Sequence, residues 1–355
     1  MKKVTSKDVA QLAGVSQSTV SLILSNNKKS LFSDQTKERV YAAAQQLGYR
    51  LPSHGTAGST ERRKLIMILT HTLSNMYYSE LTQSIEQYAN ECGYRVISCN
   101  TFRQSELEKY YLDLCEQIRP EGIIYTFLPN FPRMVEQLSQ TMPIVLIGEK
   151  TDELAIPSIE LSNIKAGGLL ADHLIELGHT HFAFLSTPKN NITLSRVQRL
   201  EGIRMRLAEH GLEKNLSVYF REDDAEFDFM RLLPFEYETG YDLTLRLLKD
   251  GCKATAIIGV NDATSLGILG ALHEKGHRVP EEYSVCGFDN IFPSMVSNPP
   301  LTTVDHHLNI RGQAAVDIIL SRVGPRSTNG SSITQMVNKI EYESQLIVRE
   351  STARR

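Results

Sequence analysis

The chain has 355 residues, of which 41% are hydrophobic and 22% are charged. This length can bury a sizeable core and exceeds one ordinary domain, so two or three structural units are expected. No apolar run is long enough to span a membrane, and the opening segment MKKVTSKDVAQ lacks the apolar stretch of a secretion signal. The five cysteines are odd in number and form no C-x-x-C pair. We therefore expect a cytoplasmic protein with reduced thiols.

Charge is distributed unevenly along the chain. Residues 1–64 contain eleven Lys or Arg and four Asp or Glu, a net charge of +7. Because the whole chain carries −3, residues 65–355 carry −10. A basic segment ahead of an acidic body indicates a module that binds a polyanion, joined to a part that does not. The alternative is a chance distribution of surface charge.

Residues 4–25 read VTSKDVAQLAGVSQSTVSLILS, which predicts two helices joined by a tight turn at Gly14. Ser16 is placed to cap the second helix, and Ser33 to cap a third that ends at Gly48. The positions expected to face inward are Val9, Leu12 and Ala13, then Val20, Ile23 and Leu24, then Val40, Ala44 and Leu47. Gln17, Ser18, Ser21 and Leu22 are expected on the outward face of the second helix.

Three short helices on a basic unit indicate a helix-turn-helix DNA reader, with a small helical bundle for protein contacts as the alternative. The stretch DVAQLAGVSQSTVSLILS, followed by TKERVYAAAQQLGY, closely resembles the DNA-binding head of the lactose and galactose repressor family. The resemblance implies base contacts from the first, second and sixth residues of the second helix: Gln17, Ser18 and Leu22. It implies phosphate contacts from Thr5, Ser16, Thr19, Ser21, Lys29, Ser33 and Thr36.

The chemistry of the three reading residues agrees with that role. The Gln17 amide can bond bidentately to adenine, and the Ser18 hydroxyl can pair with several base edges. Leu22 replaces the polar residue that is usual there, and an outward leucine fits a thymine methyl group. We therefore expect an A·T pair at that operator position.

Residues 51–64 are rich in Gly, Ser and Thr and then basic, which indicates a hinge linker. In the resembling family this segment forms a short helix on DNA and inserts a leucine into the minor groove. Gly55 and Gly58 weaken a helix here, and no leucine lies between Pro52 and Leu65. We expect electrostatic phosphate contacts from the basic end of the linker instead: Arg62, Arg63 and Lys64.

From Leu65 onward, short apolar runs alternate with amphipathic stretches. This alternation predicts one or two parallel sheets with helices on both faces. The expected strands are KLIMILT, YRVISC, EGIIYTF, PIVLIG, HFAFLS, TAIIGV and YSVCGF. Ligands of such folds bind at the carboxyl ends of the strands.

Polar side chains stand at several of these strand ends: Glu149, Asn261, Asp262 and Asp289, with Arg199 opening a helix beyond HFAFLS. Each alone could be a helix cap or a surface ion pair. Together they can hydrogen-bond a polyhydroxylated or anionic small molecule. Tyr77, Tyr78 and Phe127 could supply a stacking face, although buried aromatics are more often core residues.

The body also resembles the effector-binding part of the same repressor family, which is similar to periplasmic sugar-binding proteins. The matching stretches are LIELGHTHFAFLS, QRLEGIRMRLAEHGL, AIIGVNDATSLGILGALHEKGHRVPEEYSVCGFDN, NPPLTTV and QLIVREST. The resemblance implies effector contacts at Glu149, Arg199, Asn261 and Asp289. Ser162 and Asn163 stand where the family often has Asp and Asn, which changes one edge of the cleft. Residues 223–236 match no family pattern and have no functional interpretation.

The stretch HEKGH at residues 273–277 has the letters of a zinc-protease motif, which requires both histidines on one continuous helix. Gly276 and the nearby Pro280 predict that the helix ends before His277, so two solvated histidines are the preferred interpretation. The chain has no G-x-S-x-G and no P-loop. We expect no catalytic residue, metal or cofactor. A transport receptor would share the body but would need a secretion signal and no basic head.

The sequence thus predicts an all-α helix-turn-helix head over residues 1–50 and a hinge linker over 51–64. Residues 65–355 are expected to form an α/β body of two subdomains, like a periplasmic binding protein, that binds an effector and dimerises. The expected function is a homodimeric transcription regulator, a repressor, that binds pseudo-palindromic double-stranded operator DNA. Its effector is expected to be a sugar or sugar derivative, with a phosphorylated carrier protein as the open alternative.

Overall fold

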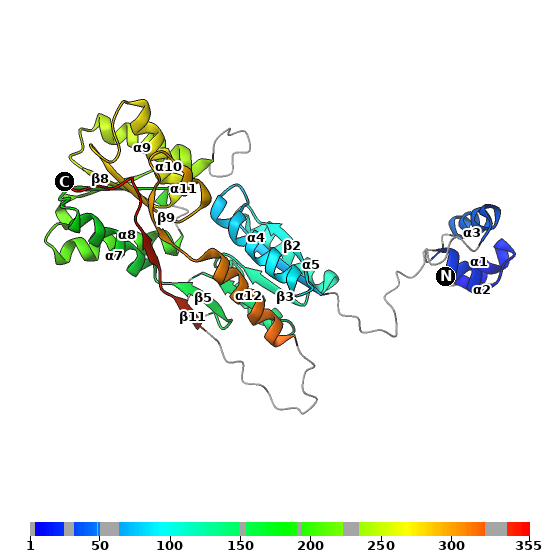
Figure 1. Cartoon of the computed structure of the whole chain (residues 1–355). Helices are drawn as coiled ribbons and strands as arrows, with labels where there is room; N and C mark the ends of the chain where they lie inside the picture. Colours follow the sequence, from blue (N-terminus) through cyan, green and yellow to red (C-terminus); the bar gives the residue numbers. More distant parts are fainter. Residues whose placement is uncertain are drawn as a thin grey trace. The chain divides into compact units, whose positions relative to one another are not determined.

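The computed structural model describes residues 4–24, 32–47, 49, 64–148, 154–189, 193–222, 234–323 and 339–355. It divides into two compact units, Met1–Arg62 and Arg63–Arg355, which are described separately below (Figure 1). We call them the head and the body. Within the described ranges, no helix has the length and apolarity needed to cross a membrane.

The head contains the three predicted helices: α1 (Ser6–Ala13), α2 (Gln17–Leu24) and α3 (Asp34–Gln46). Gly14 makes the turn after α1 with a φ of 62°, a left-handed conformation that glycine adopts without strain. The Ser16 hydroxyl accepts a hydrogen bond from the backbone N–H of Thr19 at 3.1 Å. The Ser33 hydroxyl accepts one from the N–H of Thr36 at 3.3 Å. Both predicted caps are therefore confirmed.

The head has a small core built from one face of each helix. Its buried members are Val9, Ala10, Ala13, Val20, Ile23, Val40, Ala43 and Ala44, with Leu24 and Leu47 packed at the edge. The prediction for Leu12 was wrong, because its side chain is 48% exposed. Ala10 takes the inward position, which places Leu12 on the flank of α1. Gly48, the predicted end of α3, lies outside the described residues.

The body contains two six-stranded sheets. In sheet order, the first subdomain has β11 (Lys339–Tyr342), β5 (Ser158–Leu161), β4 (Ile144–Ile147), β3 (Gly122–Tyr125), β1 (Leu65–Thr70) and β2 (Arg95–Asn100). The second has β12 (Gln345–Ile347), β10 (Thr302–Asp305), β9 (Ser284–Asp289), β8 (Ala256–Gly259), β6 (Phe182–Ser186) and β7 (Leu216–Phe220). All pairs are parallel except β10 with β12. The seven predicted strands are confirmed, whereas β5, β7, β10, β11 and β12 were missed.

Helices cover both faces of each sheet, because alternate strand residues point to opposite faces. On the first sheet, α4 (Met76–Glu91) and α12 (Leu308–Arg322) cover one face, and α5 (Ser105–Ile118) and α6 (Pro132–Ser139) the other. On the second sheet the pairs are α7 (Asn163–Glu176) with α8 (Leu194–Glu209), and α9 (Phe235–Lys249) with α10 (Asp262–Glu274). The short elements are η3 (Glu213–Asn215) and α11 (Phe292–Val296).

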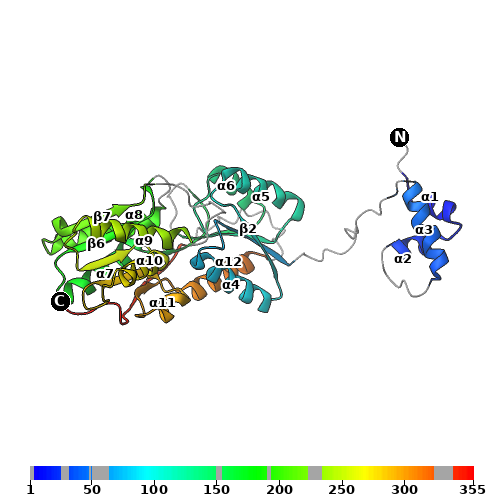
Figure 2. The same ribbon diagram turned by 90° about the horizontal axis from the view of Figure 1, so that it is seen from above.

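The chain passes between the two subdomains three times. It crosses between β5 and α7, between β10 and α12, and between β11 and β12. As a result α12, which comes late in the chain, packs beside α4 of the first subdomain, as both views show (Figures 1 and 2). Three short connections join two separately packed layers, an arrangement that permits the subdomains to rotate about a hinge.

Glycines bring the paired helices of the second subdomain into backbone contact. A Cβ on Gly202 of α8 would lie 2.0 Å from the carbonyl oxygen of Ile164, and one on Gly167 of α7 would lie 2.2 Å from that of Arg199. The pair α9 and α10 is built in the same way at Gly240 and Gly267. No larger residue fits these four positions without moving a helix.

The segment HEKGH adopts the predicted helix end. Helix α10 stops at Glu274, and Gly276 follows with a φ of 77°. The His277 Nδ1 atom then lies 2.8 Å from a carboxylate oxygen of Glu282, in the connection to β9. His273 and His277 therefore do not share a helical face, and the geometry that the zinc motif requires is not formed.

Candidate effector cavity and nucleic-acid interface

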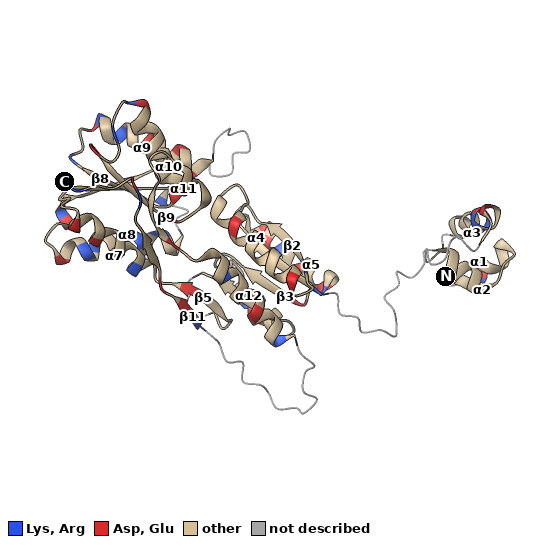
Figure 3. Ribbon diagram, in the orientation of Figure 1, with Lys and Arg blue, Asp and Glu red and all other residues tan. Residues whose placement is uncertain are grey.

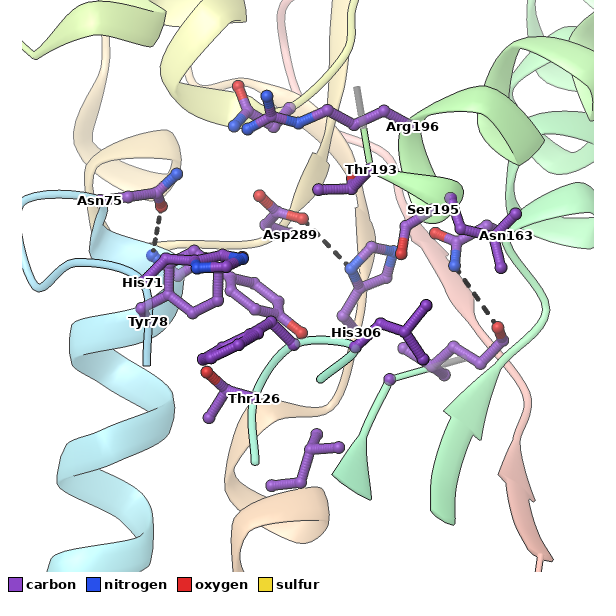
Figure 4. Close-up of a pocket in the computed structure, with 18 of the residues that line it drawn as sticks. His71, Asn75, Tyr78, Thr126, Asn163, Thr193, Ser195, Arg196, Asp289 and His306 are labelled. Atoms are coloured by element: carbon purple, nitrogen blue, oxygen red, sulfur yellow. Dashed lines mark hydrogen bonds and ion pairs between the residues drawn. The ribbon is translucent and has the colours of Figure 1, made fainter. Parts of the chain in front are cut away.

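A cavity of about 420 Å³ lies between the two subdomains, at the carboxyl ends of the strands (Figure 4). The first subdomain contributes the start of α4 and the loops after β1, β3 and β4. The second contributes the start of α8 and the ends of β8 and β9. Four of the predicted effector residues line it together: Tyr77, Arg199, Asn261 and Asp289. The fifth, Glu149, lies outside the described residues, although its neighbour Gly148 lines the cavity.

Arg199 is the centre of a buried polar network. It lies in the second turn of α8, so it does not open the helix as predicted. Its Nε donates to the Asn163 side-chain oxygen at 3.0 Å, and its Nη1 donates to the Val260 carbonyl at 2.7 Å. Its Nη2 lies 3.1 Å from Asp289 Oδ1 and 3.2 Å from His306 Nδ1. A guanidinium with this many partners is held rigidly, which fixes the wall of the cavity around it.

Asp289 and His306 complete this network. Burial alone would raise the pKa of Asp289, but Arg199 and His306 outweigh it and hold that pKa below its usual value of 3.8. Burial lowers the pKa of His306 to about 4, and the nearby Arg199 adds to this effect. At neutral pH the site therefore holds an ionised carboxylate and a neutral imidazole. Asp289 also adopts a φ of 114°, a strained conformation for any residue with a side chain.

A second buried network joins the two subdomains. Glu236 of α9 accepts hydrogen bonds from Arg196 Nη2 at 3.1 Å and from Asn75 Nδ2 at 2.8 Å. Arg196 and Glu236 belong to the second subdomain, whereas Asn75 caps α4 in the first. A further contact across the cleft is the backbone N–H of Phe292, which donates to Glu80 at 2.9 Å. The two subdomains are thus joined directly by hydrogen bonds between side chains and backbone.

Aromatic rings from the first subdomain form another part of the cavity wall, beside Asn75 (Figure 4). The rings of His71 and Phe127 stack with centroids 4.1 Å apart, and Tyr78 meets His71 edge to face at 5.9 Å. The Tyr77 hydroxyl accepts a hydrogen bond from Arg311 Nη1 at 3.2 Å. Burial lowers the pKa of His71 well below 6.5, and Arg103 and Arg196 lower it further. This wall offers flat apolar faces with polar edges to a ring-shaped ligand.

Asn261 and Asp262 have different positions although they are adjacent. The Asn261 side chain caps α10, accepting at Oδ1 from the N–H of Thr264 at 2.9 Å, and it lines the cavity. Asp262 is fully buried behind it, where Thr303 donates to its carboxylate at 2.6 Å. Burial raises the pKa of Asp262 well above 3.8, and the charge of Asp289 adds to this effect. Asp262 therefore supports the fold and is not part of the cavity wall.

Sequence reasoning missed many of the lining residues, among them five with polar side chains that form the networks described above: His71, Asn75, Arg196, His306 and Arg311. His71 follows a predicted strand, β1, so the rule that ligands bind at strand ends could have identified it. His306 follows β10, which was itself missed. Arg311 reaches the cavity from α12, and no local pattern predicts that this helix crosses back to the first subdomain.

The start of α2 presents the predicted reading residues. Gln17 and Ser18 are exposed, and Ser21 and Leu22 are half-buried. The Gln17 Nε2 atom donates to the Ser6 hydroxyl at 2.9 Å, which orients its amide. The predicted phosphate-contacting residues within the described ranges are Thr5, Ser16, Thr19, Ser21, Ser33 and Thr36, all in α1 to α3 or at their caps. Lys29 lies outside those ranges.

The basic surplus of the head is not on the three helices. Their charged residues are Lys7, Lys37 and Arg39, balanced by Asp8, Asp34 and Glu38. Figure 3 shows both signs on α3. The remaining positive charge of residues 1–64 belongs to Lys64 and to seven Lys or Arg outside the described ranges. The helices can therefore supply shape and base contacts, and the flanking segments supply the charge.

A three-helix head with an exposed recognition helix, joined to a two-subdomain α/β body with a polar cleft, defines a class of protein. It is the class of ligand-responsive, DNA-binding transcription regulators.

Comparison with known proteins identifies the family within this class. Residues 5–52 match the model of bacterial regulatory proteins of the lacI family, and residues 63–343 match that of the periplasmic binding proteins and sugar binding domain of the LacI family. The chain belongs to the LacI family and is a DNA-binding transcription regulator controlled by an effector.

Among its relatives, the transcriptional repressor PurR of Haemophilus influenzae is 32% identical over 98% of both chains. The transcriptional regulator DegA of Bacillus subtilis is 29% identical over 99% of this chain and 98% of its own. The lac repressor dimer bound to operator and an anti-inducer is 25% identical, with a TM-score of 0.68 over 99% of this chain and 100% of its own.

Proposed function

We propose that the effector binds in the cavity between the two subdomains, against Arg199, Asn261, Asp289 and Tyr77, with Glu149 at its edge. The observation that carries this proposal is the convergence of the first four residues on one cavity from four separate segments of the chain. Cavities of this size, with a few converging polar groups, are the usual binding sites of such folds.

We further propose that the effector is a sugar or a sugar derivative. Asp289 supplies an acceptor, Asn261 and Arg199 supply donors, and the rings of His71 and Phe127 supply a stacking face. The hydroxyl groups of a sugar ring can bond to these donors and acceptors, and its apolar C–H faces can stack on the aromatic rings. The match of residues 63–343 to a family model of sugar-binding domains supports this class.

The head is proposed to read the operator with Gln17, Ser18 and Leu22, and to hold phosphates through Thr5, Ser16, Thr19, Ser21, Lys29, Ser33 and Thr36. The exposure of Gln17 and Ser18 at the start of α2 supports this assignment. The chain acts as a homodimer, so the two heads require a pseudo-palindromic operator. Acting on chromosomal DNA, it would work in the cytoplasm, and its role would be regulatory and not catalytic.

Effector binding is proposed to change the angle between the subdomains and so to reposition the heads. The two contacts across the cleft, Asn75 to Glu236 and Phe292 to Glu80, are the bonds that such a rotation would break or form. The coupling between effector and operator must be reciprocal and is typically about 1–3 kcal/mol.

A gel-shift titration on inverted-repeat oligonucleotides tests this proposal. The full chain is expected to bind one operator sequence well above unrelated DNA, and a cognate ligand is expected to change that affinity about 5–150-fold. Arg199→Ala should abolish the response to ligand. Binding that no sugar, sugar acid or sugar phosphate alters would refute control through the cavity.

A further inference from the structure

We propose that the effector carries an anionic group, a phosphate or a carboxylate, that binds at the N-terminus of α8 against His306. This inference rests on the proposed function of the cavity and names the chemical class of its ligand. Three features of the cavity support it: an open helix end, a buried atom without a partner among the described residues, and a wall in which arginines outnumber carboxylates.

The helix end faces the cavity. Helix α8 has 16 residues and its N-cap, Thr193, makes no side-chain cap hydrogen bond. Thr193, Leu194, Ser195 and Arg196 all line the cavity. Arg196 and the next residue donate their N–H groups to the Thr193 carbonyl, whereas those of Leu194 and Ser195 have no acceptor in the described part of the chain. Free N–H groups and the helix dipole together favour an anion at such an end.

His306 provides the independent observation that a ligand belongs here. It is 1% exposed, it lines the cavity, and its Nε2 atom has no hydrogen-bond partner among the described residues. Its Nδ1 atom lies 3.1 Å from Asp289 Oδ1 and 3.2 Å from Nη2 of Arg199, in the second turn of α8. Because a guanidinium can only donate, Nδ1 accepts from Arg199, and the single hydrogen of the neutral ring is on Nε2, where it can be donated to a ligand. Figure 4 shows the imidazole beside Ser195. Leaving a buried polar atom unpaired costs about 1–3 kcal/mol, a cost that a bound ligand would remove.

The charged side chains that line the cavity indicate the charge of its ligand. Four arginines line the cavity, Arg103, Arg196, Arg199 and Arg311, whereas Asp289 is the single carboxylate that does so within the described ranges. Glu236, just behind the wall, compensates Arg196. Both lining histidines are neutral at pH 7, because burial and the neighbouring arginines lower the pKa of each. Cationic side chains therefore outnumber carboxylates among the described lining residues, which suits an anionic group on the ligand.

These features assign a contact set to the anion. Its oxygens would accept hydrogen bonds from the N–H groups of Leu194 and Ser195, from the Ser195 hydroxyl and from His306 Nε2. The sugar-binding groups Asn261 and Asp289 then remain available to the rest of the ligand. A phosphate or a carboxylate would fulfil the same role, so the experiment must separate the two.

The test uses inorganic phosphate, sulfate and acetate as probes and thermal unfolding of the full chain as the readout. At a fixed ionic strength set with chloride, about 50 mM phosphate is expected to raise the melting temperature of the wild-type body, because a ligand that binds only the native state stabilises it. A larger effect of phosphate and sulfate than of acetate would identify a phosphoryl group, and the reverse a carboxylate.

Two variants locate the effect. Ser195→Asp places a negative charge in the first turn of α8, which favours the helix but repels an anion, so the apparent Kd for phosphate should weaken at least about tenfold. Lys189→Gln, at a second hollow beside β7, removes a cation outside the cavity and should leave the response unchanged. The proposal is overturned if none of the probes stabilises the wild type beyond chloride, or if Ser195→Asp responds as the wild type does.

Failure of this inference can be told from failure of the proposed function. A neutral sugar that alters operator affinity, with no response to any anion, would leave the effector cavity intact and remove only the anionic group. Anion stabilisation that Ser195→Asp abolishes, without any ligand that alters operator affinity, would leave the anion site and remove its regulatory role.

Discussion

Asn75 joins the two subdomains through one atom and caps α4 through another. Its Nδ2 donates to Glu236 across the cleft at 2.8 Å, and its Oδ1 accepts from the Tyr77 N–H at 3.0 Å. Two substitutions separate these roles, because serine and aspartate both keep a capping oxygen. Aspartate has no N–H to donate, and the serine hydroxyl is one bond shorter than the amide that bonds to Glu236. Asn75→Ser therefore removes the bond to Glu236, and Asn75→Asp replaces it with a second carboxylate.

The structure sets the size of each effect. A buried hydrogen bond to a charged group contributes about 1.5–3 kcal/mol, and 1 kcal/mol shifts the melting temperature of a domain of this general size by about 2–4 °C. Asn75→Ser should therefore lower the melting temperature of the body by at least about 3 °C. Asn75→Asp should cost more, since two close like charges add a repulsion on the order of 4 kcal/mol at partial burial.

Calorimetry of the full chain near pH 7 and near pH 5 would measure both. The repulsion in Asn75→Asp raises the pKa of the introduced carboxyl. The loss of stability relative to wild type is therefore full above that pKa, and it should shrink as the pH falls, until it equals the loss in Asn75→Ser. Asn309→Ser, at an exposed position near the start of α12, is the matched control. The reasoning fails if both Asn75 variants melt within about 1 °C of wild type, or if the aspartate variant is no worse than the serine variant.

Three further predictions concern the buried network and the reading helix. Arg199→Met leaves the Asp289 carboxylate buried without its cation. Urea titration of this variant should show a free energy of unfolding lower by about 3–5 kcal/mol than that of wild type. Adding Asp289→Asn should recover most of this loss. The pKa of His306 is lowered from 6.5 to about 4, so its contribution to the free energy of unfolding is complete above pH 6.5 and falls as the pH drops toward 4. His306→Gln should reduce the change of unfolding free energy with pH in this range. An unchanged pH dependence would contradict a neutral buried imidazole. Gln17→Ala should weaken operator binding by about 1–3 kcal/mol and relax specificity at one base pair, whereas Leu22→Ala should reduce the preference for A·T at another, both measured by gel shifts on single-base operator variants.

Most of the architecture could be predicted from the sequence because its signals are local. The turn glycine and the capping serines define the helix boundaries of the head, and apolar runs define the seven predicted parallel strands. Three of the missed strands, β7, β11 and β12, lie at sheet edges, where exposure breaks the apolar run, as in β11 with its alternately exposed KIEY. The other two, β5 (SIEL) and β10 (TTVD), are buried but contain polar residues, so they form no continuous apolar run. The crossing of α12 back to the first subdomain depends on tertiary packing, which no local period encodes.

The predicted cavity residues stand at strand ends or in the following helix, where topology alone brings them together. The network around Glu236 could not be found in this way. Glu236 closes an acidic and aromatic stretch without a recognisable pattern, and its partners, Asn75 and Arg196, are 161 and 40 residues away. Such a contact depends on the angle between two subdomains, a quantity that sequence periodicity does not carry.

Gly202, at the contact between α7 and α8, lies outside the cavity but affects the positions of residues that line it. Gly202 lets the two backbones touch, and this depth of packing determines how far the guanidinium groups of Arg196 and Arg199 extend toward the ligand. A methyl group at that position would push α8 outward and withdraw both charges together. Variants that no longer respond to the effector should therefore include substitutions at this helix contact, among residues that do not touch the ligand.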